Sequence, residues 1–315
     1  MIDFTINTEY ENMRLDRFVQ KNCTSISKMS IQKMMRKGRI KINGKKPKPD
    51  TRIHTGDHVK IFISTSDKKE RPPKPNVPPP EILYEENDFI AVNKPAGLVS
   101  HPSKGSKDSL SERIYAYLYD NLDKEGTFVP GVINRLDTNT SGIVLAPKTP
   151  LAAQKMYALM RENKIKKSYC VLAKGRIEKK LILKTYAKKN KKENKMYPSN
   201  ISDKNAVFMH TIFTPIEYIG GNTLLKAKLL TGKTHQIRFQ LYCINHPVAG
   251  DPKYKDENFN RFMYEKYHLN RQFLHCYEMS FPFWQDQSII KITSTYSDDL
   301  DKVYKKLKQE QTHRF

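Results

Sequence analysis

One carboxylate in a turn of small polar residues is the first feature of this sequence that could do chemistry. Asp137 lies within "INRLDTNTSG", which runs from Ile133 to Gly142. The Thr, Asn, Ser and Gly residues that follow it favour tight turns and hydrogen-bond the local backbone. The apolar run "IVLA" comes next and is typical of a buried strand that would anchor the loop. From this window alone, Asp137 is either an ordinary turn residue or an acid presented for reaction.

An arginine about a hundred residues later could act on such an acid. In "LLTGKTHQIRFQLYCIN" a strand is expected to end at Gly232, and a helix follows with Ile237 and Leu241 on one apolar face. Arg238 lies off that face. It is either a solvated surface residue or the partner of a buried acid, which its charge would keep ionised in a dry site.

A tyrosine among cations is the third candidate. Tyr169 begins a strand-like segment, "KSYCVLAKG", and follows Lys164, Lys166 and Lys167. A tyrosine in this setting can serve as a platform on which a nucleic-acid base stacks. Most strand tyrosines simply pack, so the position alone does not decide its role.

The charge of the chain indicates the class of partner. Lys and Arg number 56 against 33 Asp and Glu in 315 residues, a net charge of +23. Such an excess favours a polyanion, with nucleic acid ahead of an anionic membrane surface. No apolar run is long enough to cross a bilayer and no secretion signal is visible, so we expect a cytoplasmic protein without membrane contact. The cysteines have no C-x-x-C spacing, which argues against a zinc site or a disulfide framework.

The first 63 residues predict a small α+β domain. "MRLDRFVQKN" and "SKMSIQKMMRKG" have helical apolar spacing, "RIKINGK" carries an Asn-Gly hairpin signal, and "GDHVKIFI" reads as a closing strand. Basic residues cluster where the second helix meets the first strand, and we expect them to bind RNA. They are Arg36, Lys37, Arg39 and Lys41.

A proline-rich linker over residues 64–80 is expected to separate this domain from a second one at 81–315. Six of the ten residues 71–80 are proline, which excludes a helix or a central strand. Beyond it, short alternating segments predict an α+β fold with a large, mainly antiparallel sheet and helices at 109–121 and 150–163. The lysine-rich tract 179–195 is expected to be an exposed loop or hairpin tip, either merely solvated or in contact with RNA.

Several blocks together resemble a known enzyme family. "NRLDTNTSG" resembles the signature loop of the RluA-type pseudouridine synthases, and "VNKPAGLVSHP", "GKTHQIR", "NHPVAGDPKY" and "QFLHC" resemble further family blocks in the right order. The resemblance covers roughly 81–304, and residues 1–63 resemble the small alpha-L RNA-binding domain. One position departs from the pattern: Asn134 stands where better-known members carry histidine, which puts the loop geometry and the sub-specificity in question.

The resemblance implies an activity and the residues that carry it. These enzymes convert uridine in RNA to pseudouridine without a cofactor or a metal ion. Asp137 takes the place of the catalytic aspartate, which either attacks covalently or removes a ribose proton. Arg238 takes the place of its salt-bridge partner, and Tyr169 that of the tyrosine which stacks on the target base and is also linked to proton transfer. Arg135 would fill the space of the flipped nucleotide, and Lys167 would bind RNA.

The RNA substrate is expected to be large-subunit (23S) ribosomal RNA. Relatives that act on several large-subunit sites commonly carry the accessory N-terminal domain, which is an analogy at the level of the family. Two alternatives stay open: a pseudouridine synthase acting on transfer RNA, and a non-catalytic RNA-binding or ribosome-assembly protein that kept the fold. A monomer is the expected oligomeric state.

Overall fold

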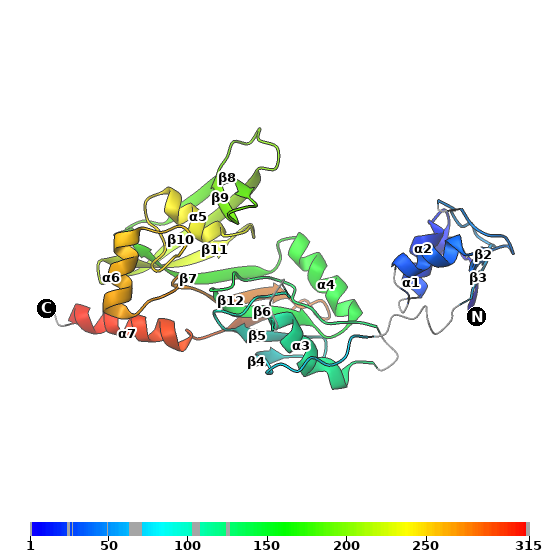
Figure 1. Cartoon of the computed structure of the whole chain (residues 1–315), viewed down its shortest axis with the longest axis horizontal. Helices are drawn as coiled ribbons and strands as arrows, with labels where there is room; N and C mark the ends of the chain where they lie inside the picture. Colours follow the sequence, from blue (N-terminus) through cyan, green and yellow to red (C-terminus); the bar gives the residue numbers. More distant parts are fainter. Residues whose placement is uncertain are drawn as a thin grey trace. The chain divides into compact units, whose positions relative to one another are not determined.

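The computed structural model describes residues 2–312 except 24, 25, 27, 49, 63–70, 103–107 and 124–126. The chain divides into two compact units, Met1–Lys74 with Asn121–Val129, and Pro75–Asp120 with Pro130–Phe315 (Figure 1). Each is described by itself. Residues 71–80 of the expected linker contain no helix or strand, whereas 64–70 lie outside the described residues. The domain boundaries given by the sequence therefore stay predictions.

The small unit packs two helices against a three-stranded sheet. The helices are α1 (Leu15–Asn22) and α2 (Lys28–Arg36), and the antiparallel strands lie in the order β1 (Ile2–Thr5), β3 (His58–Ile61), β2 (Ile40–Ile42). A short 3₁₀ helix, η1 (Thr8–Tyr10), precedes α1. The two helices, the hairpin and the closing strand match the sequence pattern. Strand β1 was not predicted.

The apolar stripes of the two helices close the core of this unit. Leu15, Phe18 and Val19 of α1 meet Ile31 and Met34 of α2, all almost fully buried, in one cluster. The Asn-Gly turn after β2 has left-handed backbone at both residues, as a tight hairpin turn requires.

The larger unit holds one sheet of ten strands with helices on both sides (Figure 1). In chain order its elements are β4 (Glu81–Glu85), β5 (Phe89–Lys94), α3 (Leu110–Leu118), η3 (Tyr119–Asn121), β6 (Ser141–Pro147), α4 (Pro150–Arg161), β7 (Lys166–Lys174), β8 (Leu181–Asn190), β9 (Lys195–Pro198), β10 (Val207–Ile219), β11 (Asn222–Leu229), α5 (Gln236–Cys243), α6 (Glu257–Tyr267), β12 (Leu274–Pro282), β13 (Ile289–Thr293) and α7 (Asp298–Thr312).

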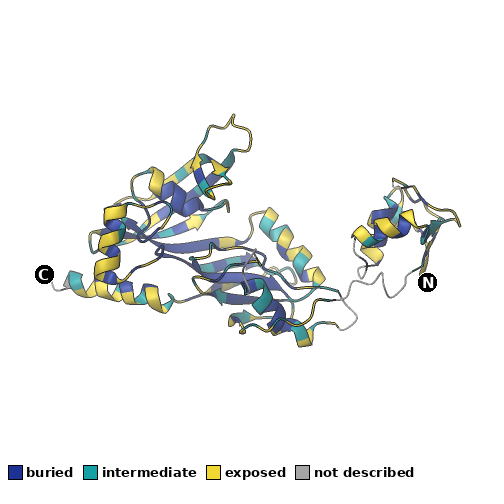
Figure 2. Cartoon of the chain, in the orientation of Figure 1, coloured by how far each residue is buried: buried dark blue, intermediate teal, exposed yellow. Residues whose placement is uncertain are grey.

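The sheet order is β4-β5-β6-β12-β7-β11-β10-β8-β9, and β13 pairs with β12. The β6–β12 pair is parallel and the other pairs named in the sheet are antiparallel, so the mainly antiparallel α+β fold is confirmed. The central strands are the most deeply buried, and every residue of β6 is buried (Figure 2). The loop that carries Asp137 leads directly into this strand.

Successive side chains of β7 point to opposite faces of the sheet. Cys170 and Leu172 pack on one face against apolar residues of α6 and α7. Tyr169 and Lys167 point to the other face, where α5 packs through Phe239 on the β8–β10 part of the sheet. The site-forming loops lie on this second face.

The helices expected at 109–121 and 150–163 are present as α3 and α4. The lysine-rich tract, expected to be an exposed loop or hairpin tip, is mostly strand β8, which pairs with β10; only residues 191–194 form the turn to β9. Helices α6 and α7 were not predicted from the sequence. No helix within the described residues is both long and apolar enough to cross a membrane.

Candidate active site

The loop before β6 presents Asp137 near the start of this central strand. The Thr140 N–H donates to the Asp137 carbonyl at 2.9 Å, which closes the turn, and the Gly97 N–H donates to the Thr138 carbonyl at 2.9 Å. The side chain of Asp137 is 28% exposed, whereas that of its partner Arg238 is 4% exposed. The turn of small polar residues therefore leaves one carboxylate facing outward.

A buried lysine at the end of β5 holds the part of the loop that follows Asp137. Lys94 donates from Nζ to the carbonyls of Pro95, Thr138 and Thr140 at 2.8, 2.9 and 3.0 Å. Burial lowers the pKa of Lys94 to about 7; the charge of Arg271 adds to this shift, and that of Asp137 opposes it. In its charged form Lys94 can donate one hydrogen to each of the three carbonyls, which ties the loop after Asp137 to the end of β5.

Asn134 and Gly142 fix the two ends of the loop on the sheet. Asn134 is buried; its Oδ1 accepts from the Leu145 N–H at 2.9 Å and its Nδ2 donates to the Ile143 carbonyl at 3.3 Å. Gly142 has φ +117°, and a Cβ there would lie 2.2 Å from the Cys276 carbonyl oxygen. Only glycine allows β6 to approach β12 this closely. Asn134, which departs from the family pattern, therefore anchors the loop to β6 through two hydrogen bonds.

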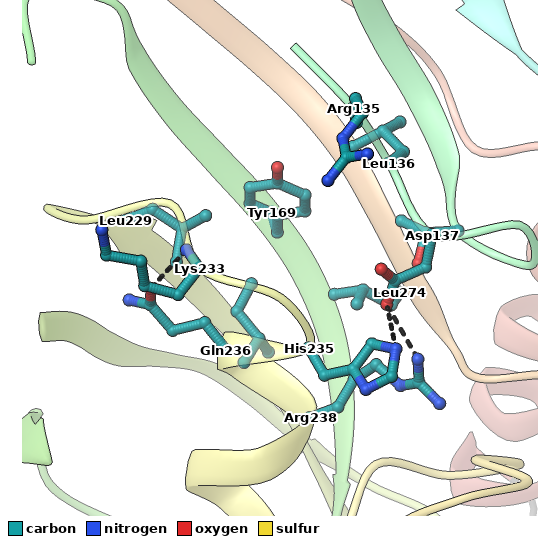
Figure 3. Close-up of a pocket in the computed structure, with 12 residues that line it drawn as sticks. Arg135, Leu136, Asp137, Tyr169, Leu229, Lys233, His235, Gln236, Arg238 and Leu274 are labelled. Atoms are coloured by element: carbon teal, nitrogen blue, oxygen red, sulfur yellow. Dashed lines mark hydrogen bonds and ion pairs between the residues drawn. The ribbon is translucent and has the colours of Figure 1, made fainter. Parts of the chain in front are cut away.

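Arg238 reaches Asp137 from the first turn of α5. Its Nη1 donates to Asp137 Oδ2 at 2.8 Å, across 101 residues of chain (Figure 3). Arg238 is buried, 3% exposed. Burial favours a lower pKa for Arg238, but Asp251 and Asp137 raise it overall, so it stays charged. Of the two roles open to Arg238 in the sequence, the structure selects the one that pairs it with an acid.

Asp251 completes the group and was missed in the sequence. It is fully buried and accepts from Arg238 Nε at 2.6 Å and from Nη2 at 2.8 Å. Burial favours a higher pKa for Asp251, but the hydrogen bonds and charge of Arg238 and the amides of Tyr254 and Lys253 lower it overall. The signal was its place as the acid of the block "NHPVAGDPKY", in the turn after α5.

Tyr169 and Lys167 line the wall opposite the acid. Tyr169 is 6% exposed and borders the same cavity as Asp137 and Arg238. Burial raises its pKa well above the ordinary value, so the phenol keeps its proton. Lys167, two residues earlier on the same face, has its Nζ 3.9 Å from Met160 Sδ, and burial lowers its pKa. Tyr169 is the fourth residue of β7, near the strand start that the sequence indicated.

The cavity opens into a cleft of about 710 Å³ with a basic rim. Arg135 is exposed at this rim, beside Asp137 (Figure 3). Lysines from three other segments also line the cleft. They are Lys189 of the β8–β9 hairpin, Lys233 before α5 and Lys253 after it. A polyanion entering the cleft would meet positive charge before it reached the partly exposed carboxylate of Asp137.

The basic residues predicted in the first 63 residues lie in the small unit. Arg36 and Lys37 are exposed at the end of α2. Arg39 is half-buried and donates to the Phe62 carbonyl at 2.9 Å, while Lys41 lies over the Phe62 ring at 5.7 Å. Arg36 and Lys37 are thus more accessible to a partner than Arg39 and Lys41. Within the described ranges, no group of three or more His, Cys, Asp or Glu is arranged to hold a metal ion.

Comparisons with known proteins point in one direction. A family model described as RNA pseudouridylate synthase matches residues 88–242. "Ribosomal large subunit pseudouridine synthase C" of Haemophilus influenzae is 28% identical over 97% of this chain and 94% of its own length. An "Uncharacterized RNA pseudouridine synthase" of Aquifex aeolicus is 31% identical over 81% of this chain and 80% of its own.

Solved structures share the fold. "Human RNA Pseudouridylate Synthase Domain Containing 4" has a TM-score of 0.60 at 17% identity, over 72% of this chain and 93% of its own. "Human RNA Pseudouridylate Synthase Domain Containing 1" has a TM-score of 0.56 at 22% identity, over 75% and 90%. With the sequence relatives, these matches identify the chain as a member of the RNA pseudouridine synthase family.

Proposed function

We propose that this enzyme converts specific uridines of large-subunit ribosomal RNA to pseudouridine, with Asp137 as the catalytic residue. The observation that carries this proposal is the ion pair between Asp137 and the buried Arg238 in a cleft with a basic rim. The pair places the positive charge of Arg238 2.8 Å from the carboxylate that faces the cleft.

The reaction exchanges one bond of the nucleotide for another. The bond between ribose C1′ and uracil N1 breaks, the base turns, and C1′ joins C5, whose hydrogen is released as N1 takes up a proton. Attack on C1′ and removal of a ribose proton both need an ionised carboxylate beside the sugar. Asp137 meets that need, since its Oδ2 is held by Arg238 while the side chain stays partly exposed.

The target base must leave its helix to reach this carboxylate. Tyr169, on the wall across from Asp137, supplies a flat ring on which the extruded uracil stacks, and Arg135 at the rim takes the vacated position in the RNA. The basic residues of the small unit and the lysines at the cleft bind phosphates, so affinity depends on salt. Arg36 and Lys37 are the residues of the small unit best exposed for this.

Relatives that match nearly the whole chain are named as ribosomal enzymes, which supports a ribosomal substrate. Relatives called ribosomal large subunit pseudouridine synthase C, from Haemophilus influenzae and Escherichia coli, match 97% and 96% of the chain. The test is to incubate the purified protein separately with unmodified large-subunit ribosomal RNA and with transfer RNA, and to map pseudouridine by carbodiimide and primer extension. New stops in the ribosomal RNA are expected. Stops in transfer RNA alone would move the substrate to that class, and no stops in either would refute the proposal.

A further inference from the structure

His235 faces the proposed catalytic acid from the residue before α5. Its backbone is left-handed, with φ 54° and ψ 20°, and its side chain makes no cap bond to the helix. The imidazole is 6% exposed, and Nε2 lies 4.0 Å from Asp137 Oδ2, beyond hydrogen-bond distance (Figure 3). A non-glycine residue in this conformation is uncommon, and such residues gather at functional sites.

A chain of hydrogen bonds sets which ring nitrogen carries the proton. The Met196 N–H of β9 donates to the Tyr254 hydroxyl at 2.7 Å. That hydroxyl lies 3.1 Å from His235 Nδ1. Burial raises the pKa of Tyr254 to about 12, so the hydroxyl keeps its hydrogen. Its oxygen already accepts from Met196, and the described residues offer its hydrogen no other acceptor than Nδ1. Nδ1 therefore accepts.

The proton of the neutral ring must then be on Nε2. Burial lowers the pKa of His235 and Arg238 acts in the same direction, against the opposing charges of Asp137 and Asp251. A neutral imidazole whose Nδ1 accepts carries its hydrogen on Nε2. Asp137 Oδ2 lies 4.0 Å from Nε2, too far to accept this hydrogen. Nε2–H is thus a donor at the cleft with no hydrogen-bond acceptor among the residues described.

We propose that His235 donates a hydrogen bond from Nε2 to an acceptor oxygen of the nucleotide bound at Asp137. This inference rests on the proposed function, because it assigns a further substrate-contacting residue to the same site. Two kinds of oxygen share the required chemistry: the ribose 2′-hydroxyl and a uracil carbonyl. The Met196 amide and the Tyr254 hydroxyl are positioning groups that act through the ring.

The tautomer can be read directly in the free enzyme. Long-range ¹⁵N–¹H spectra of protein labelled at its nine histidines distinguish a protonated Nε2 from a protonated Nδ1, and the signal that disappears in His235→Asn is that of His235. A protonated Nε2 and a bare Nδ1 are expected. The reverse pattern, or a charged ring at neutral pH, would overturn the proposal. If His235→Asn fails to fold, His235→Gln gives the same assignment.

Kinetics test the donation. Asparagine tolerates left-handed backbone but places no donor where Nε2 lies, whereas glutamine can place its amide there. We expect His235→Asn to lower kcat about tenfold with unchanged RNA affinity, and His235→Gln to recover most of that loss. His268→Asn is the matched control: His268 also has left-handed backbone (φ 58°), after α6, and does not line the cleft. Wild-type kcat in His235→Asn would refute the proposal.

Substrates altered at one atom identify the oxygen. RNAs carrying 2′-deoxyuridine, 2-thiouridine or 4-thiouridine at the target are compared in wild type and His235→Asn. The RNA altered at the accepting oxygen should react more slowly than unmodified RNA, and this loss of rate should be larger in the wild type than in His235→Asn. Equal losses in both proteins for every RNA would overturn the inference. If wild type makes no pseudouridine from unmodified RNA, the proposed function fails instead.

Discussion

Asp251 binds two of the three guanidinium nitrogens of Arg238, both from a fully buried position. The bidentate bond fixes the plane of the guanidinium, so that the remaining nitrogen points at Asp137. Two acids thus share one arginine: the buried one orients it, and the exposed one is available to substrate.

Asp251→Asn should therefore damage both activity and stability. The variant leaves a buried guanidinium without its bidentate partner, so we expect unfolding to become easier by about 3 kcal/mol and kcat to fall about a hundredfold with little change in RNA affinity. Denaturant melts and single-turnover assays measure the two effects. Asp256→Asn, five residues along in a partly exposed pair with Lys174, should cost about 1 kcal/mol and leave kcat unchanged. Equal effects of the two variants would contradict the orienting role of Asp251.

Lys94 gives the protein a signature in the pH dependence of its stability. Its pKa falls from the ordinary 10.5 to about 7 on folding. Between these values the unfolded chain binds the proton and the folded one does not, so the free energy of unfolding rises with pH across this window and decreases again as pH falls toward 7. Lys94→Met should lack this component. The difference in free energy of unfolding between the two proteins should change by a few kcal/mol between about pH 7 and 10.5. Parallel curves of this free energy against pH would exclude a buried lysine of low pKa.

Arg36 and Lys37 should contribute to RNA affinity by binding phosphates at their own positions in the small unit. Reversing both to Glu should weaken binding and make the slope of log affinity against log salt shallower by about 1 for each phosphate that the protein no longer binds. Filter binding at several salt concentrations measures this. Lys302→Glu with Lys306→Glu, on exposed positions of α7, gives a control of the same net charge. An identical decrease of RNA affinity in the control would mean that only the net charge of the protein matters, and would contradict a specific contact at Arg36 and Lys37.

The sequence predicted the acid and its arginine because each lies in a short block whose residue types are demanding, even though 101 residues separate them. It could not show Asp251 or Lys94 in their roles, since both act through contacts that exist only once the loops meet. Strand β1 was missed because its partner, β3, lies more than fifty residues away. Helix α7 was readable in principle, since Leu300, Val303 and Leu307 have helical spacing, but the surrounding charges obscured that stripe.

The central claim is that Asp137 performs the reaction, and the most direct measurement is pseudouridine formation by Asp137→Asn. The substitution keeps the size of the side chain and removes the charge that Arg238 holds. We predict no detectable pseudouridine under single-turnover conditions, at least about a thousandfold below wild type, with RNA affinity and melting temperature close to wild type. Pseudouridine formed by this variant at a rate near that of the wild type would contradict the account.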